Sequence, residues 1–294
     1  MSFLDRFAAA ATPPNPASLQ LLFAADLLDL TAEALTAAVR DYHPSLSAAT
    51  IDLVPAGELP AAATGITPDG PPPLLLGLAA WGEHVVKIVA FDSPMPPNAV
   101  ESSLRPALLP PEFKEQVRRH RAHALLYYAG RHAEPLEQLV AVSCVAGAMA
   151  HLGTIATLNE EARAAVASFA LLPDDDGEDM LASLRGLPIP FLFGGFVKME
   201  LTDVPGVWLR TFACQRLGLP NLAYHSPGHA DGERVFHLFS GILGYLRETG
   251  LAFEPGELVR VDEATSIRVR EPEPKEWWLD SDGPLWVLEP AEAS

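Results

Sequence analysis

The chain alternates between short apolar runs and longer segments in which apolar residues recur at helical spacing. Runs rich in Leu, Val and Ala, bounded by Gly, Pro or polar clusters, predict strands. Segments that follow a good N-cap residue or a first-turn proline predict helices. The predicted strands cover 19–23, 50–54, 74–78, 85–91, 122–128, 153–157, 191–201, 207–213, 221–225, 258–261, 266–269 and 285–288. The predicted helices cover 32–42, 97–104, 110–118, 134–150, 160–170 and 231–249.

Two stretches of the chain share one order of predicted elements: strand, helix, strand, further strands and helix. The first covers about 19–118 and the second about 121–249. Most of these strands are joined by turns too short for parallel crossovers, so they should pair antiparallel. We therefore predict an α+β fold with two mostly antiparallel sheets flanked by helices, consistent with internal duplication of a β-α-β-β-β-α unit. The predicted parts are a flexible segment (1–18), a first unit (19–118), a second unit (119–270) and a C-terminal strand and tail (271–294).

The apolar faces of the periodic segments predict the core. The residues expected there are Leu125, Leu136, Val140, Leu209, Phe236, Leu243 and Leu246. The two cysteines, Cys144 and Cys214, lie in a helical and a strand pattern. Two isolated thiols form neither a disulfide framework nor a zinc ligand set, so we expect both to be small buried hydrophobic residues.

Net charge narrows the range of partners. The chain has 20 basic and 38 acidic residues, a formal charge of −18. Such a field repels phosphate backbones and anionic lipid surfaces, so we expect neither nucleic acid nor a membrane as partner. It would favour a basic protein partner, although solubility alone also accounts for it. No signal-peptide pattern and no apolar run of membrane-spanning length is present, which predicts a cytoplasmic protein.

One cluster has the side chains of metal ligands: His225, His229, Glu233 and His237. Glu233 and His237 are four residues apart and would share a helix face. A Pro-Gly pair keeps His225 and His229 off that helix, and the spacing differs from the paired-histidine helix of zinc proteases. The alternative is a polar start to the helix, so we predict that these residues bind no metal and that the protein has no cofactor.

A basic island interrupts the acidic chain. Its members are Lys114, Arg118, Arg119, His120, Arg121 and His123. Guanidinium groups suit carboxylate or phosphate, which makes Arg118, Arg119, Arg121 and His123 candidate contacts for an anion or a partner. The alternative is the solvated end of a helix, where basic residues are favoured by the helix dipole.

Two further features are weaker. The acidic run 174–179 lacks the alternating ligands and terminal glutamate of a calcium loop, so we predict a surface loop. Aromatic residues are enriched at interfaces, yet we expect Trp277, Trp278 and Trp286 to seal the last strands against the core. No serine or cysteine lies in a nucleophile-elbow frame.

Three parts of the chain carry a resemblance to a known family. They are His120–Leu126, the pair Val207–Ala213 and Gly218–Tyr224, and the helix Val235–Leu246 with Gly256-Glu257 after it. Together they resemble the bacterial domain-of-unknown-function family 4261, most clearly over about 186–270 and more weakly from 19 to 130. None of these motifs is catalytic, so the resemblance transfers no site. It implies a bacterial cytoplasmic protein with an accessory or immunity-type role.

The sequence thus favours a non-enzymatic protein that binds a basic protein partner through an acidic surface. The alternative is a metal-dependent or hydrolase-like enzyme that uses His225, His229, Glu233 and His237.

Overall fold

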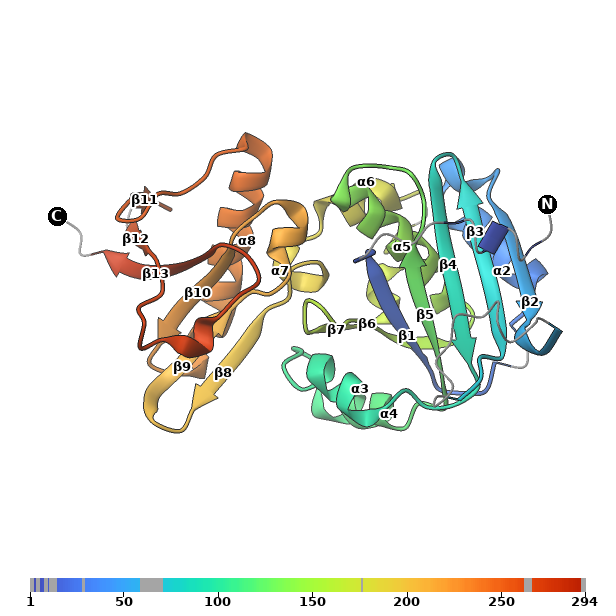
Figure 1. Ribbon diagram of the computed structural model, residues 1–294, viewed down its shortest axis with the longest axis horizontal. Coiled ribbons are helices and arrows are strands. Elements are labelled where there is room, and N and C mark those ends of the chain that lie inside the picture. The colour runs from blue at the N-terminus through green and yellow to red at the C-terminus, as the bar shows by residue number, and fades with distance from the viewer. Residues whose placement is uncertain are drawn as a thin grey trace. The chain divides into compact units, whose positions relative to one another are not determined.

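The computed structural model describes residues 3, 6–7, 10, 15–27, 30–58, 71–175, 177–261 and 266–291. Most of the predicted N-terminal segment 1–18 lies outside these residues. The chain divides into two compact units (Figure 1). The first comprises Met1–Leu104, Leu108–Glu160 and Ala165–Leu187, and the second comprises Arg105–Ala107, Glu161–Ala164 and Pro188–Ser294.

The first unit is built on a seven-stranded antiparallel sheet with the order β2-β3-β4-β5-β1-β6-β7. Its strands are β1 (Ser18–Phe23), β2 (Thr50–Pro55), β3 (Leu75–Trp81), β4 (His84–Phe91), β5 (Ala122–Tyr128), β6 (Thr154–Asn159) and β7 (Ala164–Ala167). Strand β1 lies between β5 and β6, and its residues 19–23 are all buried. A near-continuous apolar run is what such a central strand requires.

Helices of the same unit accompany this sheet. They are α2 (Ala32–Tyr42), α3 (Pro97–Leu104), α4 (Pro111–Arg118), α5 (Pro135–Ala150) and α6 (Met180–Gly186). The predicted N-cap of α2 is confirmed, because Thr31 Oγ1 accepts a hydrogen bond of 3.1 Å from the backbone N–H of Ala34. Helix α5 packs against α2 and against strands β1, β4, β5 and β6. Every residue from Leu139 to Met149 is consequently buried.

The second unit has a six-stranded mixed sheet with the order β11-β12-β13-β10-β9-β8. Its elements are α7 (Ile189–Leu192), β8 (Val197–Leu201), β9 (Val204–Arg210), β10 (Asn221–Ser226), α8 (Gly232–Thr249), β11 (Leu258–Arg260), β12 (Ser266–Arg270) and β13 (Leu285–Ala291). Strands β10 and β13 are parallel, and the long connection between them contains α8. Helix α8 buries Phe239 and Leu243 in the core formed with the sheet, and Trp208 packs in a smaller cluster.

The predicted α+β class with two sheets is confirmed, but the predicted boundary at 118/119 is wrong. The sheet of the first unit contains β1 to β4 from one predicted half and β5 from the other, and β5 pairs with both β4 and β1. The two halves therefore do not form separate copies. Pairing between strands far apart in sequence decides this arrangement, and the order of elements does not encode it.

The predicted helix after Asn159 is also wrong. Strand β6 continues through Asn159, and residues 164–167 form strand β7, with all four side chains buried. Burial beside β6 outweighs the helix propensity of this alanine-rich segment. The predicted strand from Phe191 likewise begins later, because Ile189–Leu192 is the short helix α7.

The core prediction is partly confirmed. Val140, Leu209, Leu243 and Leu246 are buried, whereas Leu125, Leu136 and Phe236 are half-buried. Both cysteines are buried without a disulfide, and burial raises the pKa of each thiol to about 12. Across the described ranges, no helix is both long and apolar enough to span a bilayer.

Candidate partner-binding pocket beside helix α8

The four candidate metal ligands each have a different environment. His225 Nε2 lies 2.7 Å from a backbone carbonyl oxygen of β9, and His229 Nε2 lies 2.9 Å from Glu200 Oε1. Glu233 and His237 are exposed on α8. Within the residues that the structure describes, no group of three or more His, Cys, Asp or Glu side chains is placed to hold a metal ion.

The start of α8 is a closed polar network. Ser226 Oγ donates a 2.6 Å hydrogen bond to Asp231 Oδ2, and Arg234 forms an ion pair with the same carboxylate. The bond from Ser226 and the nearby guanidinium lower the pKa of Asp231, although partial burial opposes them. Arg234 Nη2 also donates to Tyr224 Oη at 3.0 Å. These bonds join the first turn of α8 to β10, and the four candidate ligands take no part in them.

The basic island is tied to carboxylates of its own unit. Arg118 Nε lies 2.6 Å from Glu101 Oε1, and its Nη1 lies 2.6 Å from Glu115 Oε1. Arg121 Nε lies 3.1 Å from Asp26 Oδ1. The ion pairs already neutralise part of the positive charge that an anion would need.

The histidines of the island are structural. His120 and His123 are buried, and burial lowers the pKa of both. His120 Nε2 accepts a 2.8 Å hydrogen bond from the backbone N–H of Met95, and His123 stacks on Phe91 with ring centroids 4.6 Å apart. Arg119 is exposed. A partner contact at this island stays a prediction.

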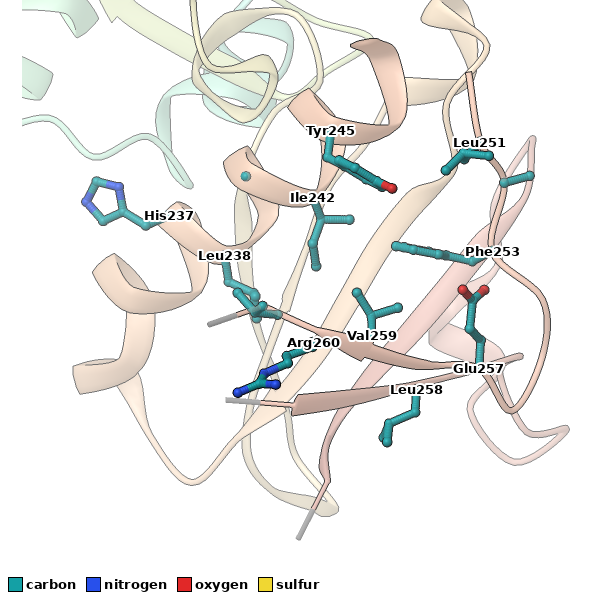
Figure 2. Close-up of a pocket in the computed structure, with 13 residues that line it drawn as sticks. His237, Leu238, Ile242, Tyr245, Leu251, Phe253, Glu257, Leu258, Val259 and Arg260 are labelled. Carbon is teal, nitrogen blue, oxygen red and sulfur yellow. The ribbon is translucent and has the colours of Figure 1, made fainter. Parts of the chain in front are cut away.

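The sequence did not single out a pocket that the structure forms between α8 and residues 251–261 (Figure 2). Its volume is about 610 Å³. Ile242 from α8, Phe253 from the connecting segment and Val259 from β11 point toward one another inside it. Leu238, Ile242 and Phe253 also belong to the main core of the unit, so the pocket opens directly onto that core.

Local signals in the sequence build the outer wall of this pocket. Helix α8 ends where Gly250 adopts a left-handed conformation, with φ of 67°, as the glycine predicts. The chain then turns at Glu254–Glu257, where Gly256 has φ of 88° and the N–H of Glu257 donates to the carbonyl of Glu254 at 3.1 Å. The Gly256 N–H donates to the Val269 carbonyl at 2.8 Å and thereby fixes the turn to the sheet.

The rim of the pocket is unusually apolar. Among the described residues, seven large hydrophobic side chains are exposed, and four of them line this pocket. These four are Tyr245 at 50 %, Leu251 at 58 %, Leu258 at 59 % and Val261 at 40 % exposed. A gathering of exposed apolar side chains is typical of an interaction site, whereas single exposed residues are ordinary.

The charged groups of the pocket lie at its edges. Glu257 and Arg260 line it from the turn and from β11, and His237 lies at one end with its ring directed away from the apolar centre (Figure 2). Residues 248–294 of the sequence contain twelve acidic and four basic side chains, so this part of the chain carries a net negative charge. The arrangement provides an apolar socket with one carboxylate, one guanidinium and one imidazole at its edges, and no nucleophile with an adjacent base lines it.

Comparison of the chain with protein-family models, curated proteins and solved structures finds no match. The resemblance to the domain-of-unknown-function family therefore stays a prediction. Of the sequence candidates, only His237 belongs to the pocket. The sequence did contain a signal for the pocket. Tyr245 lies off the buried face of α8, and Leu251 follows the end of the helix, so neither large side chain is needed for the core.

Proposed function

We propose that this protein is a non-enzymatic binding protein whose second unit holds an amphipathic, basic segment of a partner protein in the pocket beside α8. The observation that carries the proposal is the gathering of Tyr245, Leu251, Leu258 and Val261 around one pocket. Apolar anchors that enter well-formed pockets supply most of the energy in many interfaces. The volume of about 610 Å³ falls within the range of about 300–1,000 Å³ that is usual for ligand pockets.

Charge favours a basic partner over an acidic one. The formal charge of −18 produces a long-range negative field, which accelerates the approach of a cationic protein. Glu257 places a carboxylate in the pocket itself, and Glu254 and Glu248 are exposed nearby in the sequence. Arg260 and His237 line the same pocket, so its own lining is not predominantly acidic, and the preference for a basic partner rests on the net charge of the whole chain.

A protein of this kind would act by occupying a basic surface of its partner. That is the accessory or immunity-type role expected from the sequence, exerted by binding alone. No contact among the described residues favours the alternative of a metal-dependent enzyme, because the four candidate ligands have separate partners or are exposed.

The test uses a synthetic helical peptide of Leu and Lys residues as the probe, with a Leu and Glu peptide as its charge control. We expect the basic peptide to bind and the acidic one not to bind. Leu258→Ser and Tyr245→Ser should each weaken binding about tenfold or more, since hot-spot truncations cost about 2 kcal/mol. Phe169→Ser is the matched control, because Phe169 is 70 % exposed in the first unit. Equal loss in all three variants would contradict the proposal.

A second measurement tests the charge argument. The association rate of the basic peptide should fall as salt rises, because exposed charges are screened over about 8–10 Å at physiological ionic strength. Glu257→Gln should lower the association rate at low salt and leave the dissociation rate nearly unchanged. An association rate that is flat with salt would remove the reason to prefer a basic partner.

A further inference from the structure

The loop between β12 and β13 forms a second pocket, of about 630 Å³, that shares no lining residue with the pocket beside α8. Trp277 lines it and is 74 % exposed, the largest exposed fraction among the large hydrophobic side chains of the described residues. Trp286 forms a half-buried wall. The carboxylates of Glu271, Glu273 and Asp280 complete the lining on the charged side.

An ion pair between a half-buried arginine and a buried glutamate holds the base of this loop. Arg270 donates to both oxygens of Glu276 at 2.8 Å, and the Glu276 side chain is 6 % exposed. The backbone N–H of Glu273 donates to the same carboxylate at 2.7 Å. Burial acts to raise the pKa of Glu276, but the bonds from Arg270 and Glu273 outweigh it and lower the value. A carboxylate held by three donors fixes the backbone on which Trp277 sits.

A buried cation holds the loop from behind. Arg210 is 2 % exposed, and its Nη1 donates to the carbonyl oxygens of Trp278 at 3.1 Å and Asp280 at 3.3 Å. Its guanidinium stacks on Phe212, 4.1 Å from the ring centroid, and burial lowers its pKa to about 10. Asn221 Nδ2 adds a 2.9 Å bond to Ser281 Oγ. Several buried polar groups therefore bind this surface loop and hold it in one conformation.

These bonds hold the loop in a conformation that exposes the side chain of Trp277 to solvent. Next to it, Trp278 packs against Trp208 and Leu279 in a buried cluster, so the short turn Trp277–Leu279 sends one indole inward and the other outward. An exposed indole face beside carboxylates, on a backbone that needs no rearrangement, is the arrangement that attracts organic cations.

We propose that this loop is a separate binding site for an alkylammonium or guanidinium group, which would lie on the face of Trp277 and pair with the carboxylates of Glu271, Glu273 and Asp280. The side chain of Trp286, which forms one wall of the pocket, would contact the aliphatic part of the ligand. The cation would come either from a Lys or Arg side chain of a protein or from a free organic amine, since both present the same group.

The chain provides one resident competitor for this site. Lys275 Nζ lies 2.7 Å from Glu273 Oε2, and its side chain is 75 % exposed. An exposed ion pair of this kind contributes little to stability. Removal of the Lys275 ammonium group would leave the Glu273 carboxylate able to bind an incoming cation. Lys275→Ala should therefore strengthen binding, whereas a purely structural role for the loop predicts no change.

The experiment measures calorimetric binding of N-acetyl-arginine amide and of an arginine-rich peptide, with N-acetyl-norleucine amide as the uncharged control. Trp277→Ala should weaken binding of both cations roughly two- to thirtyfold, the range expected for a cation on an indole face. Glu271→Gln should weaken it less, and Lys275→Ala should strengthen it. A peptide that binds much more tightly than the single residue indicates a protein source, and equal affinities indicate a free amine.

Folding does not confuse this test, because Trp277 is exposed and its variant should melt as the wild type does. Leu258→Ser, in the pocket beside α8, is the matched control and should leave binding of N-acetyl-arginine amide unchanged, which separates this proposal from the proposed function. Unchanged cation binding in Trp277→Ala, or equally tight binding of the uncharged control, would overturn the inference.

Discussion

The longest helix of each unit meets solvent in a different way. Helix α5 of the first unit is buried continuously from Leu139 to Met149, with its neighbours packed around it. Helix α8 of the second unit buries Phe239 and Leu243 but leaves Tyr245 exposed above a pocket. An all-apolar helix belongs inside a unit, whereas an amphipathic helix with extra apolar residues on its outer face is suited to a partner.

Buried polar groups differ between the units in the same sense. In the first unit Tyr42 Oη donates to the Leu171 carbonyl at 2.6 Å, a bond that joins elements within the core. In the second unit the buried side chains of Arg210 and Glu276 form hydrogen bonds that hold a surface loop, and this loop exposes Trp277. The two units thus place these buried polar groups differently, inside the core in the first and behind an exposed loop in the second.

The sharpest way to test this comparison is to truncate the two faces of α8. Leu243→Ala removes a fully buried side chain and should lower the free energy of unfolding by about 2–5 kcal/mol. Tyr245→Ala should change it by less than about 0.5 kcal/mol, since substitutions at exposed positions are usually small. Urea denaturation of both variants measures the difference. Similar losses would mean that the outer face also carries the fold.

The ion pair between Arg270 and Glu276 in the second unit should respond next most strongly. Glu276→Gln leaves Arg270 without its carboxylate and should cost roughly 1.5–3 kcal/mol, the range for hydrogen bonds to charged groups. Because the folded pKa of Glu276 is lowered, the unfolded chain takes up the proton first as the solution is acidified. Wild-type stability should therefore fall as pH drops below about 4.5. The variant should lack this part of the fall, and parallel pH profiles would contradict the assignment.

Two glycines test the packing of the long helices with opposite expected signs. A Cβ at Gly147 of α5 would lie 2.5 Å from the Tyr42 ring, so Gly147→Ala should destabilise by about 1–3 kcal/mol. A Cβ at Gly244 of α8 meets nothing within 4 Å, so Gly244→Ala should stabilise by up to about 1 kcal/mol through helix propensity. Thermal melts of the pair are the measurement. A neutral Gly147→Ala would show that Tyr42 moves aside readily.

The smallest expected effect is a pH dependence of the first unit. Burial lowers the folded pKa of His120 and His123, so the unfolded chain binds protons more readily than the folded one. Stability should be fully present above about pH 6.5 and should decline as pH falls below it. His123→Gln keeps a neutral polar group at that position and should flatten the decline. An unchanged slope would mean that His123 does not contribute.

The amino-acid pattern by itself determined most of the elements. Thr31 and Gly250 mark helix ends, both cysteines are buried as expected, and the α+β class follows from the alternation of short apolar runs and periodic segments. These features could be predicted because caps, turns and hydrophobic periods depend on residues a few positions apart.

Only the tertiary structure decided the remainder. It pairs β5 with β1 in a single sheet, ties Arg118 to Glu101, and directs Trp277 outward while Trp278 packs inward. The pocket beside α8 likewise exists because residues 251–261 return against the helix. Each of these depends on contacts between segments distant in the sequence, whose energies no local period or motif records.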